Sequence, residues 1–121
     1  MKKLSAGIAA AVMVGALVMA SMAFAGADTG VTIAGQNGDY HGKVLSERAK
    51  CQYGRTVVVF KQKGKNQDPN TDQKIGKDTS EKQGTVGVWS IGNSGFKHGK
   101  FYALARHSTG CNPGTSKTIS R

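Results

Sequence analysis

From Gly26 onward, apolar residues occur in short runs that alternate with polar residues, and no stretch has the apolar spacing of an amphipathic helix. The runs are rich in β-branched and aromatic residues, and Gly, Asn, Asp and Ser separate them, as is typical of strands and turns. The most apolar run, Val57-Val58-Val59-Phe60, predicts a central strand. The pattern predicts seven strands, at residues 31–33, 40–44, 55–62, 75–79, 85–91, 99–107 and 115–120.

Seven short strands in fewer than a hundred residues are typical of two antiparallel sheets packed face to face. Alternation places Trp89 and Ile91 on one face of their strand, and it places Phe101, Ala103 and Ala105 on one face of theirs. We expect Trp89 to be a core side chain. The sequence therefore predicts an all-β fold, a single seven-stranded antiparallel β-sandwich over residues 26–121.

Residues 1–25 have the pattern of a signal peptide. Lys2 and Lys3 form a short basic region, and residues 4–22 contain no charged side chain. Ala23-Phe24-Ala25 then places small residues where a cleavage site after Ala25 requires them. We therefore expect secretion to the extracellular medium or the periplasm. No second apolar stretch is long enough to span a bilayer, so no transmembrane segment is expected in the mature chain.

The chain contains two cysteines, Cys51 and Cys111. In an oxidising compartment each has only the other as an intramolecular partner, which predicts a disulfide. Closing a loop of this length corresponds to about 4 kcal/mol on the chain-entropy model, which is comparable with the net stability of a small domain. The sulfur and imidazole ligands of a zinc site are not present at short spacing, so no metal site is predicted.

The composition is strongly basic, with seventeen Lys and Arg against seven acids and a net charge of +10. Without Lys2 and Lys3, fifteen basic residues remain against the same seven acids, which gives +8 for residues 26–121. Such a field attracts anionic polymers, anionic surfaces and acidic proteins. The predicted binding residues are the lysines gathered on one strand end and across the following polar loop, namely Lys61, Lys63, Lys65, Lys74 and Lys77.

Alternation also predicts that Phe60, Tyr102 and Leu104 point away from the core face. One interpretation is an exposed apolar strip bordered by Lys61, Lys100 and Arg106, in which Phe60 and Tyr102 add apolar contact to a binding surface. The other interpretation is that a long loop buries these side chains. The sequence leaves both open.

Catalytic chemistry has little support in the pattern. His41, His98 and His107 fall at an outward strand position, a turn and a strand end, so we expect three exposed histidines rather than an acid/base pair. Residues 68–72 place oxygen ligands as in the first half of a calcium loop. Gln73 and Thr79 occupy the positions where such a loop needs Gly and an acid, so a solvated loop is expected.

Short motifs between Tyr40 and Arg106 have the spacing of a known family. These are Gly42-Lys43-Val44, Val57 with Val59, Gly76-Lys77-Asp78-Thr79, Gly87-Val88-Trp89-Ser90-Ile91 and Gly99-Lys100-Phe101-Tyr102-Ala103. In this spacing the chain resembles the prealbumin-like β-sandwiches, which include transthyretin-like and carboxypeptidase-regulatory-like modules. The resemblance implies a prealbumin-like or Ig-like scaffold used mostly for non-catalytic work, such as appended modules, adhesion and carriers.

The chain departs from the family at three places. The turn over Glu81–Val86 is longer than usual, and the paired cysteines are not general to the fold. The hydrolase branch of the family ends in Tyr-Arg-Gly-Ser, whereas this chain ends in Thr118-Ile119-Ser120-Arg121. The resemblance therefore does not extend to that enzymatic activity.

Together these observations predict a secreted, non-catalytic protein that needs no cofactor and docks a basic face onto an anionic surface, polymer or acidic protein. Two alternatives remain, a small secreted basic hydrolase such as a ribonuclease and a secreted toxin or inhibitor.

Overall fold

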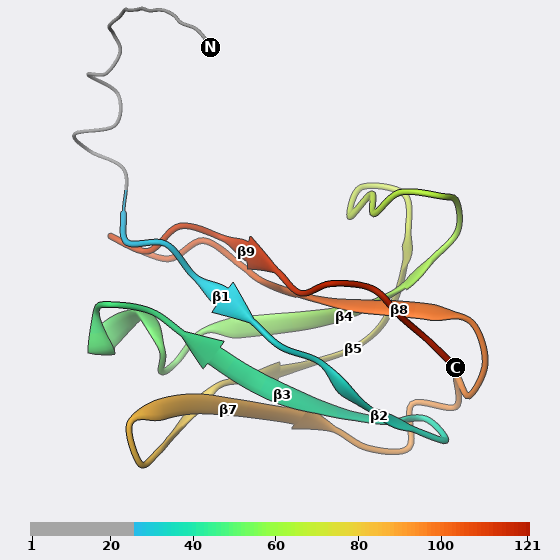
Figure 1. The fold of residues 1–121 in the computed structure, drawn as a ribbon, viewed down its shortest axis with the longest axis horizontal. Coiled ribbons are helices and arrows are strands. Elements are labelled where there is room, and N and C mark those ends of the chain that lie inside the picture. The colour runs from blue at the N-terminus through green and yellow to red at the C-terminus, as the bar shows by residue number, and fades with distance from the viewer. Residues whose placement is uncertain (1–25) are drawn as a thin grey trace, which may run out of the picture.

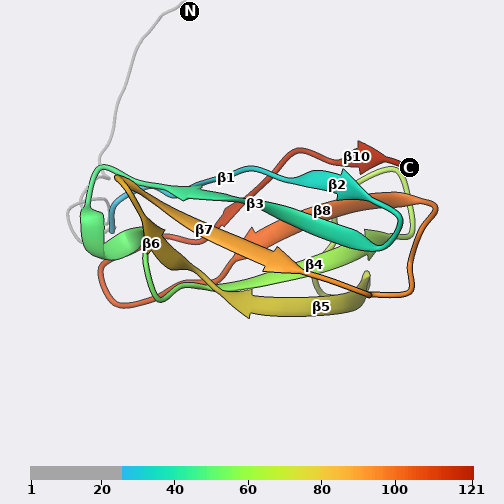
Figure 2. The same cartoon turned by 90° about the horizontal axis from the view of Figure 1, so that it is seen from below.

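The computed structural model describes residues 26–121, so the predicted signal peptide lies outside the described residues. This part of the chain forms two antiparallel sheets of five strands each, with the core between them (Figures 1 and 2). The all-β prediction is confirmed. No helix in residues 26–121 is both apolar enough and long enough to cross a membrane.

The first sheet has the order β1-β3-β7-β6, and β2 also pairs with β3. Its strands are β1 (Gly30–Val31), β2 (Ala34–Gln36), β3 (Asp39–Leu45), β6 (Glu81–Gln83) and β7 (Val86–Ile91). The second sheet has the order β10-β8-β4-β5, and β9 also pairs with β8. Its strands are β4 (Thr56–Gln62), β5 (Gln73–Thr79), β8 (Lys100–Ala105), β9 (Gly114–Thr115) and β10 (Ile119–Ser120).

The inward side chains of both sheets meet in one core. Tyr40 of β3 packs against Phe101 of β8 with ring centroids 4.8 Å apart. Trp89 lies in the same cluster, as the alternation predicts. The buried members of this cluster are Ile33, Tyr40, Val44, Val57, Val59, Trp89, Phe101, Ala103 and Ala105.

Ten strands are present in the described residues instead of the seven predicted. At two of the predicted strands the structure has a pair of short strands, with a hydroxyl in place of a backbone carbonyl as acceptor between them. Thr32 Oγ1 accepts the N–H of Lys43 between β1 and β2, and Ser116 Oγ accepts the N–H of Ala103 between β9 and β10. β1 and β2 therefore lie on either side of Thr32 and Ile33, and β9 and β10 lie at the two ends of the predicted strand 115–120.

The third difference is β6, which lies within the segment expected to be a lengthened turn. β6 pairs with β7 through Glu81 with Val88 and Gln83 with Val86. The chain passes from the second sheet to the first at Ser80, which is buried and whose hydroxyl donates to the carbonyl of Gln52. A buried hydrogen bond therefore fixes the chain where it passes from one sheet to the other.

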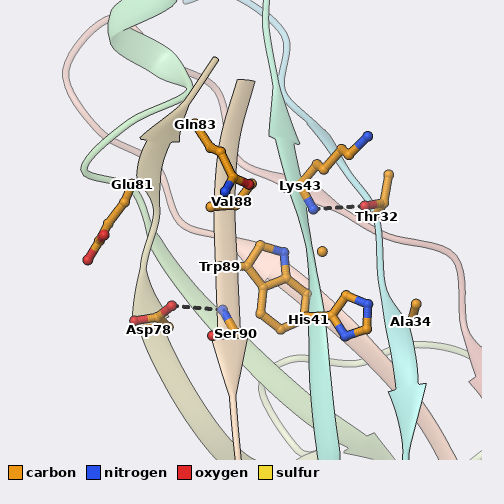
Figure 3. Close-up of a pocket in the computed structure, with 11 residues that line it drawn as sticks. Thr32, Ala34, His41, Lys43, Asp78, Glu81, Gln83, Val88, Trp89 and Ser90 are labelled. Carbon is orange, nitrogen blue, oxygen red and sulfur yellow. Dashed lines mark hydrogen bonds between the residues drawn. The ribbon is translucent and has the colours of Figure 1, made fainter. Parts of the chain in front are cut away.

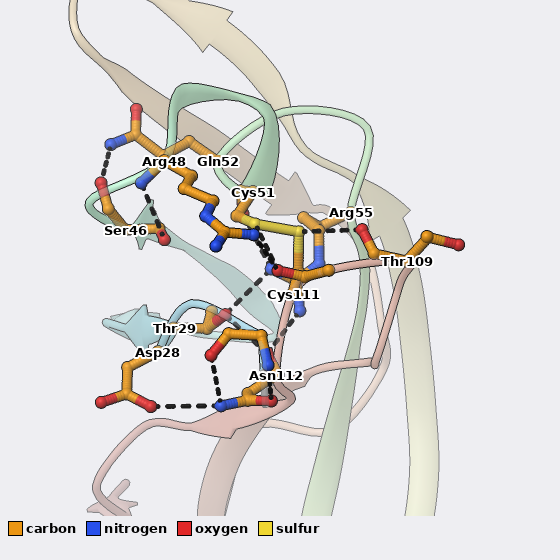
Figure 4. Close-up of a disulfide and its surroundings, with 12 residues drawn as sticks. Asp28, Thr29, Ser46, Arg48, Cys51, Gln52, Arg55, Thr109, Cys111 and Asn112 are labelled. Atoms are coloured by element: carbon orange, nitrogen blue, oxygen red, sulfur yellow. Dashed lines mark hydrogen bonds between the residues drawn. A yellow bond between two sulfur atoms is a disulfide. The ribbon is translucent and has the colours of Figure 1, made fainter. Parts of the chain in front are cut away.

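The predicted disulfide between Cys51 and Cys111 is present, and it lies at a corner organised by a buried arginine (Figure 4). Arg55 is 1 % exposed. Its guanidinium donates to the carbonyl oxygens of Cys51, Arg106 and Asn112 and to the hydroxyl of Thr29. Arg55 thus joins the start of the described chain, the disulfide and the end of β8.

Candidate basic groove

A β-bulge in β5 places Lys74 and Lys77 on the same face of the second sheet. Residues three apart on a regular strand point to opposite faces. Here Ile75 has no partner on β4, and the register shifts by one residue. The pairs around the bulge are Val58 with Lys77, Val59 with Gly76 and Phe60 with Lys74. Because Val58 and Phe60 both face away from the core between the sheets, both lysines lie on the outer face.

Between these lysines and the end of β8 lies a hollow of about 280 Å³, which we call the basic groove. Its lining residues are Val58, Lys74, Gly76, Lys77 and Arg106. Three of the five carry a positive charge, and the side chains of all three are exposed. The short side chain of Val58 on β4 leaves room between the long side chains from β5 and from the residue that follows β8.

The acid in the same strand is directed elsewhere. Asp78 pairs with the inward-facing Val57, and its carboxylate accepts the backbone N–H of Ser90 in β7 at 2.8 Å. Asp78 borders a neighbouring hollow together with Thr56 and Lys77, but it does not line the basic groove. The groove itself is therefore lined by cations and apolar or glycine positions.

The other three predicted lysines do not line the groove. Lys61 pairs with the core residue Phe101, so it belongs to the inward face of β4, and its Nζ lies 5.8 Å from the ring centroid of Phe96. Lys63 and Lys65 are exposed in the loop after β4. The structure thus brings together Lys74 and Lys77 and adds Arg106, while Lys61 points to the other side of its sheet.

The interpretation of Phe60 and Tyr102 as exposed contact residues is wrong. Both are buried, with their stacked rings 5.2 Å apart between centroids. They form a second small cluster with Val58, against which the half-buried Leu104 packs. The alternative interpretation, burial under a long loop, accounts for what is observed.

The covering segment is residues 63–72, which we call the clasp loop. The carboxylate of Asp72 at its end accepts the Tyr102 hydroxyl at 2.6 Å. In its middle, the side-chain amide of Gln67 donates to the carbonyl of Ser116 and the hydroxyl of Thr118. These partners lie beyond β8 from β4, so the loop crosses the outer face of the sheet. Phe60 and Tyr102 lie beneath this crossing.

Asp72 is a structural acceptor rather than part of a solvated loop. Burial alone would raise the pKa of its carboxyl, but hydrogen bonds from Tyr102 and from the backbone N–H groups of Asp68 and Lys63 outweigh burial and lower that pKa. Burial and the same carboxylate raise the pKa of the Tyr102 hydroxyl. No group of three or more His, Cys, Asp and Glu residues suited to a metal ion is found among the described residues.

A larger hollow of about 630 Å³ lies on the outer face of the first sheet (Figure 3). Figure 3 shows Asp78 and Glu81 on one side of β7 and His41 and Lys43 on the other. Opposite charges therefore face each other across this hollow. An anionic polymer would meet negative as well as positive side chains there, so the hollow is less suited to binding it than the basic groove is. His41, His98 and His107 are all exposed, as expected.

Two features of the groove were not predicted from the sequence. The bulge has a weak signal, since Gly76 lies inside a strand and glycine at such a position often marks a bulge. The sequence places Arg106 only in a border around an apolar strip. In the structure, the backbone N–H of Arg106 donates to the carbonyl of Thr56, and this contact between the end of β8 and β4 brings Arg106 opposite β5.

No protein-family model, curated protein or solved structure matches this chain.

Proposed function

We propose that this chain is a secreted, non-catalytic binding protein on a prealbumin-like β-sandwich scaffold. It docks the outer face of the β8-β4-β5 sheet onto an anionic polymer or surface. The observation that carries the proposal is the basic groove, in which Lys74, Lys77 and Arg106 surround one hollow. The net charge of +8 on residues 26–121 adds long-range attraction to the local site.

Lysines on β5 have a second possible role. β5 is an edge strand of its sheet, and lysines on edge strands prevent pairing with other chains. That role explains Lys74 and Lys77 but not Arg106, which follows β8 on the other side of β4. Because cationic side chains reach the groove from both sides of β4, recognition of an anion explains their arrangement better than edge protection alone.

Binding to dextran sulfate, as a model anionic polymer, tests the proposal. We expect the logarithm of the association constant to fall linearly with the logarithm of salt concentration between about 50 mM and 200 mM. The double variant K74Q/K77Q should bind more weakly and lower the slope by about two, since each lysine contributes about one.

The matched control is K43Q/K82Q, which removes the same charge from exposed positions of the first sheet. This variant should lose less affinity than K74Q/K77Q. Equal losses for the two double variants, or binding that salt does not weaken, would contradict docking through the basic groove.

A further inference from the structure

We infer that the basic groove is a discrete site for one phosphomonoester group carried by the partner, rather than a diffuse basic surface. The inference rests on the proposed function, because it names the chemical group that the same groove recognises. Four features of the groove support it, namely where its cations originate, how its floor is built, which donors line it and how much space it encloses.

The cations reach the groove from opposite sides of β4. Lys77 lies beside Val58 on β5, and Arg106 follows β8, where its backbone is fixed by a 2.9 Å hydrogen bond to Thr56. Lys74 is brought to the same face by the bulge at Ile75. Three positive side chains on a fixed frame can therefore contact one anion from several directions.

The floor of the groove is held in place from below. Val58 is buried and packs with Phe60 and Tyr102, whose hydroxyl is bound by Asp72 of the clasp loop. On the inner side, Gly76 lies so close to Ile91 that a methyl group there would be 2.8 Å from the Ile91 Cδ1 atom. The backbone on which Lys74 and Lys77 are mounted is thus positioned by packing.

The chemistry of the lining favours phosphate. A guanidinium offers a planar pair of donors that matches two oxygens of a phosphate, and each lysine adds a point charge. A phosphomonoester carries about −1.5 to −2 charges at neutral pH, whereas a carboxylate or a sulfate ester carries about −1, and its three acceptor oxygens are one more than a carboxylate has. The three cations are therefore best neutralised by a phosphomonoester.

The hollow has room for a phosphate group. At about 280 Å³ the groove lies just below the range of about 300–1,000 Å³ in which drug-sized ligands bind. The side chains of its three cations are exposed to solvent, so the groove is accessible from outside. A phosphate group can enter while the molecule that carries it stays outside.

The test is a titration of the folded protein with glycerol phosphate, followed through backbone amide signals by NMR. We expect saturable shifts centred on Gly76, Lys77 and Arg106, and weaker binding of methyl sulfate and of acetate at the same ionic strength. The variants K77Q and R106Q should each lower the affinity about tenfold, as is typical for losing a charge-assisted hydrogen bond.

Two further variants separate recognition from bulk charge. R106K keeps the charge but lacks the planar pair of donors, so it should bind glycerol phosphate several-fold more weakly than the wild type. K82Q removes one charge from the exposed strand β6 and should leave glycerol phosphate binding unchanged. Thermal unfolding of each variant checks that the fold is retained.

The outcomes distinguish the inference from the proposed function. If dextran sulfate binding depends on Lys74 and Lys77 but glycerol phosphate gives no saturable shifts, the discrete site is overturned and polymer docking stands. If glycerol phosphate binds through Arg106 while no anionic polymer binds, the site stands and polymer docking fails. Equal affinity for glycerol phosphate, methyl sulfate and acetate overturns the inference.

Discussion

Arg55 is the residue on which the corner of the fold depends most directly. Its partners are the carbonyls of Cys51, Arg106 and Asn112, so a buried positive charge is balanced by backbone dipoles and the hydroxyl of Thr29. A buried charge is tolerated only where its donors are satisfied in this way. The same arrangement fixes the carbonyl of Arg106, and hence the start of the segment that contributes a cation to the basic groove.

Replacing Arg55 with Met tests this role. We expect R55M to lower the free energy of unfolding by about 3 kcal/mol or more, because buried carbonyls lose their donors. Urea unfolding at neutral pH measures the change. The control is R48Q, since the side chain of Arg48 is exposed and makes one hydrogen bond, to the carbonyl of Gly110. Losses of similar size in R48Q and R55M would contradict the role assigned to Arg55.

At the scale of elements, the sequence predicts the strands that have a clear apolar pattern, but not the bulge or the loop that covers the outer face. The predicted strand 55–62 corresponds to β4 because of its continuous apolar run, and the predicted strand 99–107 corresponds to β8 because Phe101, Ala103 and Ala105 alternate with the residues of the other face. The sequence leaves open whether Phe60 and Tyr102 are exposed, because alternation says which face a side chain is on but not which loop covers that face. The outer position of Lys74 depends on the bulge, which shifts the period by one.

The clasp loop gives a prediction at this scale. The pKa of Asp72 is lowered in the folded state, so its contribution to stability is present above its unfolded pKa of about 3.9 and is lost as pH falls through the lower folded pKa. We expect D72N to be less stable at neutral pH by about 1–3 kcal/mol and to lose less further stability on acidification than the wild type does. Urea unfolding between neutral pH and pH values below 4 measures both effects.

The matched control for this change is D68N. Asp68 is exposed, and its carboxylate accepts one N–H, that of Asn70, within the same loop. D68N should keep most of the neutral-pH stability and the acid dependence of the wild type. An acid dependence in D72N as steep as that of the wild type would show that Asp72 does not clasp the loop to Tyr102.

At the scale of the whole molecule, both ends of the described chain are held against the sheets. Arg121 exchanges backbone hydrogen bonds with Gly99, which extends the pairing of β10 with β8. At the other end, the side chain of Asn112 accepts the N–H of Gly26 and donates to its carbonyl. Asn112 adjoins Cys111 of the disulfide. The position that would follow cleavage after Ala25 is thus part of the same corner as Arg55.

This arrangement links the proposed secretion to a measurable property of the folded protein. If export removes residues 1–25, the intact mass of the exported protein should correspond to a chain that begins at Gly26. A mass that places the first residue elsewhere would contradict the predicted cleavage site.

The packing of Gly26 gives a second prediction. A methyl group on Gly26 would lie 2.5 Å from the carbonyl carbon and oxygen of Gly110, so G26A should lower the free energy of unfolding by about 1–3 kcal/mol. G64A adds the same methyl group where nothing lies within 4 Å, and its stability should stay within about 0.5 kcal/mol of the wild type. Equal stabilities of G26A and G64A would contradict the close packing of Gly26 against Gly110.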